Sequence, residues 1–432
     1  MIRFDNDAAT DAAIKSAIMD AAVEKKLKIE IDGNEIPAQN IVSDSLRIEQ
    51  SLMDSQMLKF GGCIASTLTV TLMYIDDFLQ QLGGVESKKI QVWVVVDYMG
   101  DAIVPSDTLY PSDTLFPGNT VNRLEQLIYT GFVNSMKRLK KRIQVELTAY
   151  DELYNMAQTK CKAAISGAFD YSPVEVETLL RFMRWTLQLY DNQNDTTFAQ
   201  QLNADSGFQN ALSPHLSGAT KAAFNQYAPD DLTVVDVLNA HCELNARFAY
   251  IAPNGDLRFT TFFRDGRTAT TKKAVDENVA YYQNLTCEDF LSAQVMYLSF
   301  PYNGGNNTLD YGVTDNKRFW YISDNIITKC MDNAATVSAL VTNFWRNGTQ
   351  KNYIFYAMSQ YRPFQFTTFG EFWIELGDRL TATVTVYNPQ TGSDDSFVVD
   401  GFVLHREIRG ITNMKVTVGA EGRNYLSKEV LT

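Results

Sequence analysis

Histidine and cysteine, the residues that most often carry catalysis or bind metals, are sparse in this chain. The three histidines, His215, His241 and His405, are not spaced from one another or from Cys, Asp or Glu as metal ligands are. Cys242 follows His241, and a Cys–His nucleophile pair would require only that two such side chains meet in the fold. We favour core packing of Cys242. No nucleophile elbow, phosphate-binding loop or dinucleotide fingerprint occurs in a strand–turn–helix context, so we expect a protein that is not an enzyme and uses no metal or cofactor.

The five cysteines are odd in number and widely separated, and no two have the CxxC spacing of a zinc or redox site. We therefore expect neither a zinc site nor a disulfide framework, but reduced and mostly buried thiols in a protein made in a cytosol. The residues are Cys63, Cys161, Cys242, Cys287 and Cys330.

Asp107 and Asp113 lie in Pro105–Gly118, a connection that contains an imperfect tandem repeat of Pro-Ser-Asp-Thr-Leu followed by an aromatic residue. The spacing of a calcium-binding EF-hand is absent, and Ser-Asp pairs beside prolines usually form turns. We interpret this stretch as an extended loop and not as a metal site.

A basic run is the one strongly charged motif. It could be a solvated hairpin tip between strands near residues 128–133 and 143–149, which we favour because charge runs usually face water. It could instead contact an acidic partner surface or a passing polyanion. The candidate interface residues are Lys137, Arg138, Lys140, Lys141 and Arg142.

Composition limits the function classes further. A chain of 432 residues suggests two to four domains. A net charge of −13 argues against general nucleic-acid binding, which needs a basic face. We expect no signal peptide, because residues 8–26 carry acidic side chains and lack an apolar segment. No run of about 18 apolar residues is present, so no membrane-spanning segment is predicted.

The elements that would position these residues are mainly strands. Residues 67–72, 90–94 and 142–148 alternate apolar and polar side chains, which is typical of strands with one buried face. The last of these leads into a helical stretch at 152–157. We predict an N-terminal helical arm over residues 1–26 and a first β-barrel domain over residues 27–158, with a hairpin at Asp32-Gly33.

In the middle of the chain, the spacing of apolar residues changes from that of strands to that of helices. A capping box at Ser172–Glu175 and the stretch Thr233–Asp236 each predict a helix start. Arg247–Phe263 reads as a hairpin whose Asn254-Gly255 pair calls for a type I′ turn. We predict an α+β domain over residues 159–275.

The final third returns to alternation. Leu380–Val386 alternates with threonines as residues 67–72 do, and a short helix is predicted near residues 334–346. We predict a second β-barrel domain over residues 276–432. The predicted fold class is thus mainly β with an α+β insertion, in the form of two similar tube-like β-barrel domains plus a mixed α+β domain.

Three segments, Ile41–Leu52, Leu58–Ser66 and Leu147–Tyr154, resemble the baseplate hub (tail-associated) proteins of siphophages and prophages of gut bacteria. Asp231–Phe259 and the turn Glu375–Asp378 are similar to recurring pieces of the same family. The resemblance covers most of the chain at the level of pattern.

The resemblance implies a structural tail protein. In that family, two similar barrels in each subunit let a homotrimer form a ring with approximate sixfold symmetry, which matches the hexameric tail tube. The implied role is to link the tube to the tail tip and to form part of the ejection channel. The implied partners are the tube or distal tail protein and tip, fibre or tape-measure proteins, with transient passage of phage DNA.

The implied location is the virion tail, after synthesis in the host cytoplasm. Larger relatives carry a C-terminal hydrolase or receptor-binding extension, and this chain stops at Thr432 after its last predicted strands, so a lytic role is not expected.

Two alternatives remain open. A receptor- or carbohydrate-binding tail protein is suggested by 12% aromatic residues and by Trp320, Tyr321 and Trp345. A tail-borne cell-wall hydrolase would require a cleft with two carboxylates or a Cys–His pair.

Overall fold

The computed structural model describes the greater part of the chain. The described residues are 24–53, 59–99, 121–139, 143–162, 179–204, 229–260, 273–275, 280–287, 295–310, 318–331, 334–335, 337–338, 341, 362–369, 372, 374–388, 390–411 and 413–420. Three predicted features therefore lie wholly or largely outside them: the N-terminal arm, the Pro105–Gly118 loop and the capping box at Ser172–Glu175. None of the described helices combines the length and apolar character that crossing a bilayer requires.

The described elements are mainly strands, as predicted. The strands are β1 (Lys25–Ile31), β2 (Asn34–Glu35), β3 (Arg47–Ser51), β4 (Thr67–Met73), β5 (Lys89–Met99), β6 (Val121–Arg138), β7 (Gln144–Tyr150), β8 (Phe248–Ile251), β9 (Leu257–Thr260), β10 (Lys273–Val275), β11 (Ala280–Cys287), β12 (Val295–Tyr302), β13 (Gly305–Asp310), β14 (Arg318–Ile322), β15 (Arg362–Phe369), β16 (Arg379–Asn388), β17 (Ser393–Arg409) and β18 (Asn413–Ala420). The α-helices are α2 (Asp76–Leu82), α3 (Glu152–Gln158), α5 (Leu179–Asn194), α6 (Phe198–Ala204), α9 (Val234–Leu244) and α10 (Ile326–Lys329).

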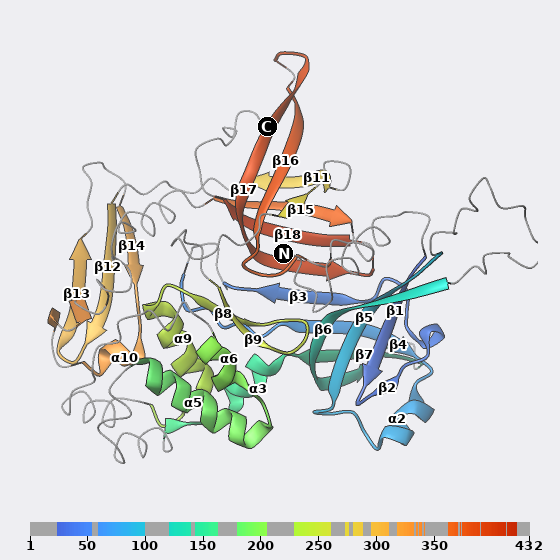
Figure 1. Cartoon of the computed structure of the whole chain (residues 1–432), viewed down its shortest axis with the longest axis horizontal. Coiled ribbons are helices and arrows are strands. Elements are labelled where there is room, and N and C mark those ends of the chain that lie inside the picture. The colour runs from blue at the N-terminus through green and yellow to red at the C-terminus, as the bar shows by residue number, and fades with distance from the viewer. Residues whose placement is uncertain are drawn as a thin grey trace, which may run out of the picture.

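One sheet of 13 strands connects the two ends of the chain (Figure 1). We call β1–β7 the first strand set and β10, β11 and β15–β18 the second strand set. The pairing order is β11-β15-β18-β17-β3-β4-β7-β6-β5-β1-β2, with β16 and β10 attached beside β17. The two sets are joined where β3 pairs antiparallel with β17, from Arg47 opposite Arg409 to Ser51 opposite His405.

Alternation along the strands of the first set builds its core, as the sequence predicts. Leu68, Val70 and Leu72 of β4 are each at most 1% exposed, while the threonines between them are half-buried. The predicted Asp32-Gly33 hairpin is confirmed between β1 and β2. Both turn residues have positive φ, 54° and 75°, as a type I′ turn requires.

Each strand set contains one long strand that changes partner along its length. The first part of β6 pairs with β5 and its last part with β7, with a register shift between Val133 and Ser135. In the same way β17 pairs first with β16 and then with β18 and β3, with a shift between Val403 and His405. Such shifts bend a strand and let it serve two neighbours.

The predicted barrels are not confirmed. The pairing order of the described strands is open, and its ends, β11 and β2, are not paired with each other. Closing a sheet requires its first and last strands to meet, and here the two sets extend each other into a single sheet instead. The boundaries predicted for the domains remain predictions.

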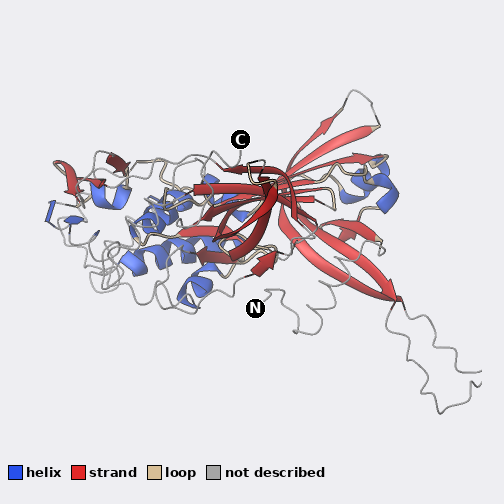
Figure 2. Ribbon diagram, turned by 90° about the horizontal axis from the view of Figure 1, so that it is seen from above, coloured by secondary structure: helices blue, strands red, loops and turns tan. Residues whose placement is uncertain are grey.

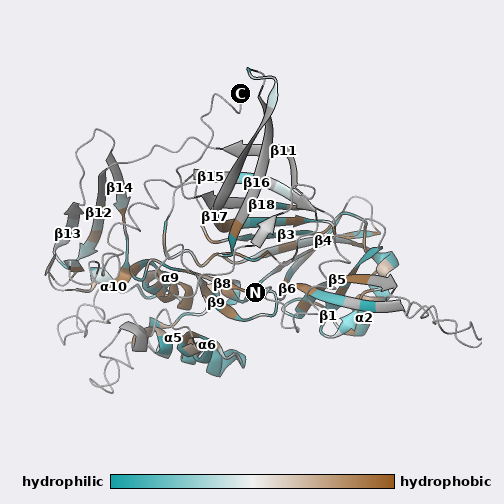
Figure 3. Cartoon of the chain, turned by 45° about the horizontal axis from the view of Figure 1, so that its top comes forward, coloured by the Kyte–Doolittle hydropathy of each residue, from teal (hydrophilic) through white to brown (hydrophobic). Residues whose placement is uncertain are grey.

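A helical layer covers one end of the sheet (Figure 2). Asp151 caps α3 by accepting the N–H of Leu153, and Thr233 opens α9 through a capping box with Asp236, so both helix starts are confirmed. The helix α9 is buried on nearly all sides, whereas α5 and α6 present hydrophilic residues outward (Figure 3). In the predicted 334–346 helix, the described residues are helical, and Val337 and Val341 are buried.

The hairpin β8–β9 forms, but its predicted type I′ turn is wrong. The loop between the paired residues Ile251 and Leu257 spans 252–256, and Gly255 has φ 93° while Asn254 is not in the positive-φ region. The reason is Pro253, whose ring fixes a negative φ and starts an ordinary turn one residue earlier. Gly255 then supplies the left-handed residue that returns the chain to β9.

Candidate functional site

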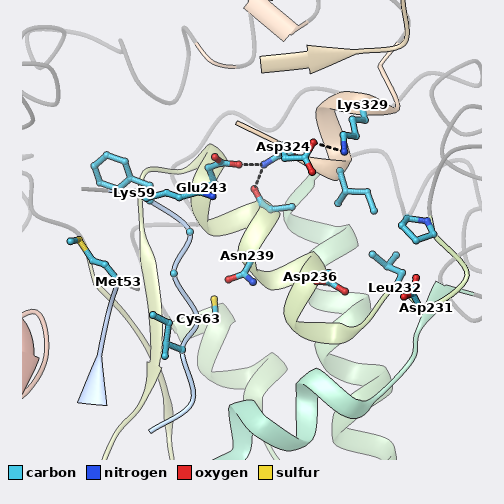
Figure 4. A pocket seen from close by; sticks show the side chains of 18 residues that line it. Met53, Lys59, Cys63, Asp231, Leu232, Asp236, Asn239, Glu243, Asp324 and Lys329 are labelled. Atoms are coloured by element: carbon cyan, nitrogen blue, oxygen red, sulfur yellow. Dashed lines mark hydrogen bonds and ion pairs between the residues drawn. The ribbon is translucent and has the colours of Figure 1, made fainter. Parts of the chain in front are cut away.

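A cavity of about 720 Å³ lies between residues 59–64, the face of α9 and residues 324–329 (Figure 4). Residues 59–64 pass flush against α9 because Gly61 has φ 87° and no side chain. A Cβ at this position would lie 2.6 Å from the carbonyl oxygen of Asn239. The Gly61 N–H donates to the Arg247 carbonyl at 2.9 Å, which fixes the loop to the end of α9.

Glu243, at the top of the cavity, is hydrogen-bonded to three side chains of the same chain. Its carboxylate accepts hydrogen bonds from the Tyr321 hydroxyl, the Ser323 hydroxyl and the Asn325 amide, each at 2.8 Å. Asn325 also donates to the Ala240 carbonyl and caps α10. Burial raises the pKa of Glu243, although the three donors oppose the shift. This carboxylate therefore fastens α9 to the segment between β14 and α10.

Two of the other carboxylates that line the cavity have partners within the chain. Asp236 is the partner of Thr233 in the capping box, and Asp324 forms an ion pair with Lys329 at 2.5 Å. Asp231 is exposed at the rim. Hydrolysis of a glycosidic bond needs two carboxyl groups that face the same substrate, whereas Glu243, Asp236 and Asp324 of the described lining are bonded to groups of the same chain.

His241 and Cys242, the adjacent pair that could carry nucleophilic chemistry, are core residues. His241 is 1% exposed, and burial lowers its pKa to about 3, so it is neutral in the fold. The Cys242 thiol is fully buried and hydrogen-bonds with Cys63, and burial raises the pKa of Cys63. Burial also lowers the pKa of His405. His215 lies outside the described residues.

A buried polar network crosses the join between the two strand sets, and sequence reasoning missed it. The Arg406 guanidinium of β17 donates to the Gln50 side chain of β3 and to the carbonyls of Phe372 and Ile374. Gln50 in turn donates to the Ser66 hydroxyl at 3.1 Å. Arg406 is 1% exposed and Gln50 is 3% exposed.

The network continues to Asp151 at the start of α3. Its carboxylate accepts the N–H of Ser66 at 2.8 Å and the N–H of Leu153 at 3.0 Å. Burial raises the pKa of Asp151 to about 7 against these hydrogen bonds. We call Arg406, Gln50, Ser66 and Asp151 the junction network. The only signal in the sequence was an aspartate directly before a helix, which indicates a cap and nothing more.

The predicted interface residues lie at the far end of β6. Lys137 and Arg138 are exposed, and Arg138 forms an ion pair with Asp76 of α2 at 2.5 Å. Lys137 stands opposite Glu146 across the β6–β7 pair. Both residues thus lie at a hairpin tip, while Lys140, Lys141 and Arg142 are outside the described residues. Their role as an interface remains a prediction.

The structure does not describe a surface cluster formed by the aromatic residues that suggested glycan binding. Tyr321 is 4% exposed and is bonded to Glu243. The side chain of Trp320 and all of Trp345 lie outside what the structure describes.

Comparison with known proteins gives likeness in structure only. No family model matches the chain, and no curated protein matches it. A tail protein from Neisseria meningitidis MC58 is 11% identical with a TM-score of 0.49, over 92% of this chain and 97% of that one.

Two further solved structures are similar at a comparable level. The 43 kDa tail protein of prophage MuSo2 from Shewanella oneidensis is 10% identical with a TM-score of 0.45, over 91% of this chain and 98% of that one. The prophage tail protein gp18 from Listeria monocytogenes EGD-e is 10% identical with a TM-score of 0.41, over 94% and 97%. Likeness at this level carries no argument for function.

Proposed function

We propose that this chain is a structural component of a phage tail, the baseplate hub that links the hexameric tail tube to the tail tip. In this proposal it acts as a homotrimeric ring with approximate sixfold symmetry and forms part of the ejection channel. Its partners are the tube or distal tail protein on one side and tip, fibre or tape-measure proteins on the other.

The observation that carries the proposal is the junction network. Three of the segments that resemble hub proteins supply its members: Ile41–Leu52 supplies Gln50, Leu58–Ser66 supplies Ser66, and Leu147–Tyr154 supplies Asp151. The turn Glu375–Asp378 follows directly on Ile374, which accepts from Arg406. The resemblance therefore falls on residues that hold the two strand sets together, as expected if a doubled architecture is what the function requires.

The two long strands that change pairing partner, β6 and β17, support the proposal that each subunit contains two similar units. Both β6 and β17 are long, bend at a register shift and pair with a hairpin partner at one end and with the body of the sheet at the other. Two such units in each subunit would give three subunits six similar positions around one axis. Sheet edges that meet between subunits would also be covered by assembly.

The chemistry of the cavity supports a role that is not enzymatic. Glu243, Asp236 and Asp324 are bonded to groups of the same chain, and His241 and Cys242 are buried in the core. Side chains with these partners stabilise the fold and are not set up for proton transfer.

The experiment is a measurement of mass in solution by light scattering over a concentration series, followed by electron microscopy of the particles. The proposal predicts a species with three times the mass of the 48.7 kDa chain and end-on views with pseudo-sixfold symmetry. A chain that stays monomeric at every concentration, also in the presence of purified tail tube protein, would contradict it.

A further inference from the structure

Two cysteines from distant parts of the chain meet beside the cavity. Cys63 belongs to residues 59–64 and Cys242 to α9, and their thiols are hydrogen-bonded to each other. The other two cysteines whose side chains the structure describes instead donate to backbone carbonyls, Cys161 to Leu232 and Cys330 to Ile326. Among the described cysteines, therefore, only Cys63 and Cys242 bring two sulfur atoms together.

The backbone holds the two thiols in place. The Gly61 N–H donates to the Arg247 carbonyl at 2.9 Å, and the Gly62 carbonyl accepts the Ala249 N–H at 3.2 Å. A Cβ at Gly61 would lie 2.8 Å from the Cβ of Glu243, so residues 59–64 run in direct contact with α9. The entropy needed to bring the two sulfur atoms together has thus already been lost on folding.

The two thiols differ in their access to the cavity. Cys63 is 8% exposed and lines the cavity of about 720 Å³, and Figure 4 shows its side chain on the side of residues 59–64 that faces α9. Cys242 is 0% exposed and is not among the described residues of the lining. A reagent small enough to enter the cavity therefore reaches Cys63 first. Burial raises the pKa of Cys63, so its reaction is slower than that of an exposed thiol.

We propose that Cys63 and Cys242 form a disulfide bond when the folded protein meets hydrogen peroxide or another small peroxide. The Cys63 thiolate attacks one peroxide oxygen, the O–O bond breaks, and hydroxide leaves and takes up the thiol proton, which gives a sulfenic acid on Cys63. The Cys242 sulfur then attacks the Cys63 sulfur, the S–O bond breaks, and water leaves with the second thiol proton. In total the two thiols lose two electrons and two protons, and one hydrogen peroxide is reduced to two water molecules.

The bond would tether residues 59–64 to α9, which otherwise are joined through hydrogen bonds and packing. A cross-link between residues far apart in the sequence restricts the unfolded chain, so the oxidised protein should be the more stable form. The bond forms whether or not the chain assembles into a tail. A protein that folds in a reducing cytosol would acquire it only after release.

The first test is peptide mapping of the wild type by mass spectrometry without reduction. The folded protein is treated with hydrogen peroxide, and its remaining free thiols are then alkylated in denaturant. The expected product is a linked pair of peptides with Cys63 and Cys242, about 2 Da lighter than the two thiol peptides together. Cys161 and Cys330 should stay free and be alkylated, as internal controls. Two alkylated thiols at Cys63 and Cys242, or a sulfinic acid at Cys63 in place of the linked peptides, would overturn the proposal.

The order of attack is tested by trapping the sulfenic acid with dimedone. Cys242→Ser removes the second thiol, so peroxide should leave a sulfenic acid on Cys63 that dimedone labels more strongly than in the wild type. Cys63→Ser should leave Cys242 unlabelled, because that thiol is enclosed in the core. Cys161→Ser, a matched change of another buried thiol, should form the linked peptides as the wild type does. Equal labelling of Cys63 in the wild type and in Cys242→Ser would show that Cys242 does not attack it and would overturn the proposal.

Denaturant titration tests the tether. Peroxide treatment should shift the unfolding midpoint of the wild type to higher denaturant concentration, and dithiothreitol should reverse the shift. The midpoint of Cys63→Ser should not change with either reagent. An oxidised wild type that contains the linked peptides but unfolds at the midpoint of the reduced protein would overturn the stabilising role of the bond.

Discussion

Arg406 and Arg138 lie in two regions of the sheet that use the same side chain in opposite ways. Arg406 is 1% exposed at the join between the strand sets and donates to three acceptors of the protein. Arg138 is exposed near the end of β6, where it forms an ion pair with the exposed carboxylate of Asp76. A buried charge without hydrogen-bond partners strongly destabilises the fold, whereas an exposed ion pair contributes little to stability. The isolated arginine in an alternating strand thus helps to hold the two strand sets together, whereas the exposed arginine adds little to stability.

The largest effect is expected at the join. Arg406→Met should lower the free energy of unfolding by about 3–5 kcal/mol, because it leaves Gln50 and the carbonyls of Phe372 and Ile374 buried without their donor. Denaturant titration measures this change. The control is Arg123→Met in β6, whose side chain is 53% exposed and whose ion pair with Glu125 should contribute less than about 1 kcal/mol. Equal losses in the free energy of unfolding for the two variants would show that the buried arginine is no more important for stability than the exposed one.

A smaller loss of stability is expected when Gln50, the hydrogen-bond partner of Arg406, is replaced. Gln50→Ala should cost about 2 kcal/mol, since hydrogen bonds to a charged group contribute about 1.5–3 kcal/mol. The double variant Gln50→Ala/Arg406→Met should cost less than the sum of the single variants, because the two residues share one interaction. Additive costs in this cycle would mean that the two side chains act independently. Gln91→Ala, at a half-buried position of β5, is the control.

The network also predicts a pH dependence through Asp151. Burial raises its folded pKa to about 7 from the ordinary value of 3.8, so folding favours the protonated form. Its contribution to stability is complete below about pH 4 and is lost as the pH rises toward 7, with a slope of at most about 1.4 kcal/mol per pH unit.

The measurement for Asp151 is the free energy of unfolding between pH 5 and 7 in the wild type and in Asp151→Asn. The wild-type curve should fall relative to that of the variant over this range, because asparagine does not titrate. Parallel curves would show that Asp151 does not titrate there.

The smallest effect on stability is expected at the end of β6. Arg138→Ala should change the free energy of unfolding by less than about 0.5–1 kcal/mol, because both partners of its ion pair are more than half exposed. Thermal unfolding of the monomer under dilute conditions checks this value. A loss as large as that of Arg406→Met would show that the exposed ion pair stabilises the fold as strongly as the buried network does.

The sequence predicted what local patterns encode. Alternation located β4 and β7, the capping residues Asp151 and Thr233 located α3 and α9, and the Asp32-Gly33 pair located a hairpin. These signals depend on neighbours within a few residues, where steric and hydrogen-bonding preferences operate directly.

What the sequence did not predict depends on contacts between distant residues. Gln50 and Arg406 are 356 positions apart, and neither is unusual in its own strand, so nothing local indicated that they meet. Their meeting makes one sheet where two barrels were expected. Of the basic run, only Lys137 and Arg138 are described, and they lie at the end of β6. The exposure and positive φ of Tyr74 follow from the turn at the end of β4 and have no sequence signature.

Native-state hydrogen exchange across the join tests whether the junction network makes the two strand sets one structural unit. In the wild type, the amides of β3 and of the second half of β17 should open with the same free energy, and Arg406→Met should lower protection on both strands by a similar amount. If β17 and β18 opened alone while β3 and β4 kept their protection, the strand sets would be separate units that merely touch, and the account of a single joined sheet would be contradicted.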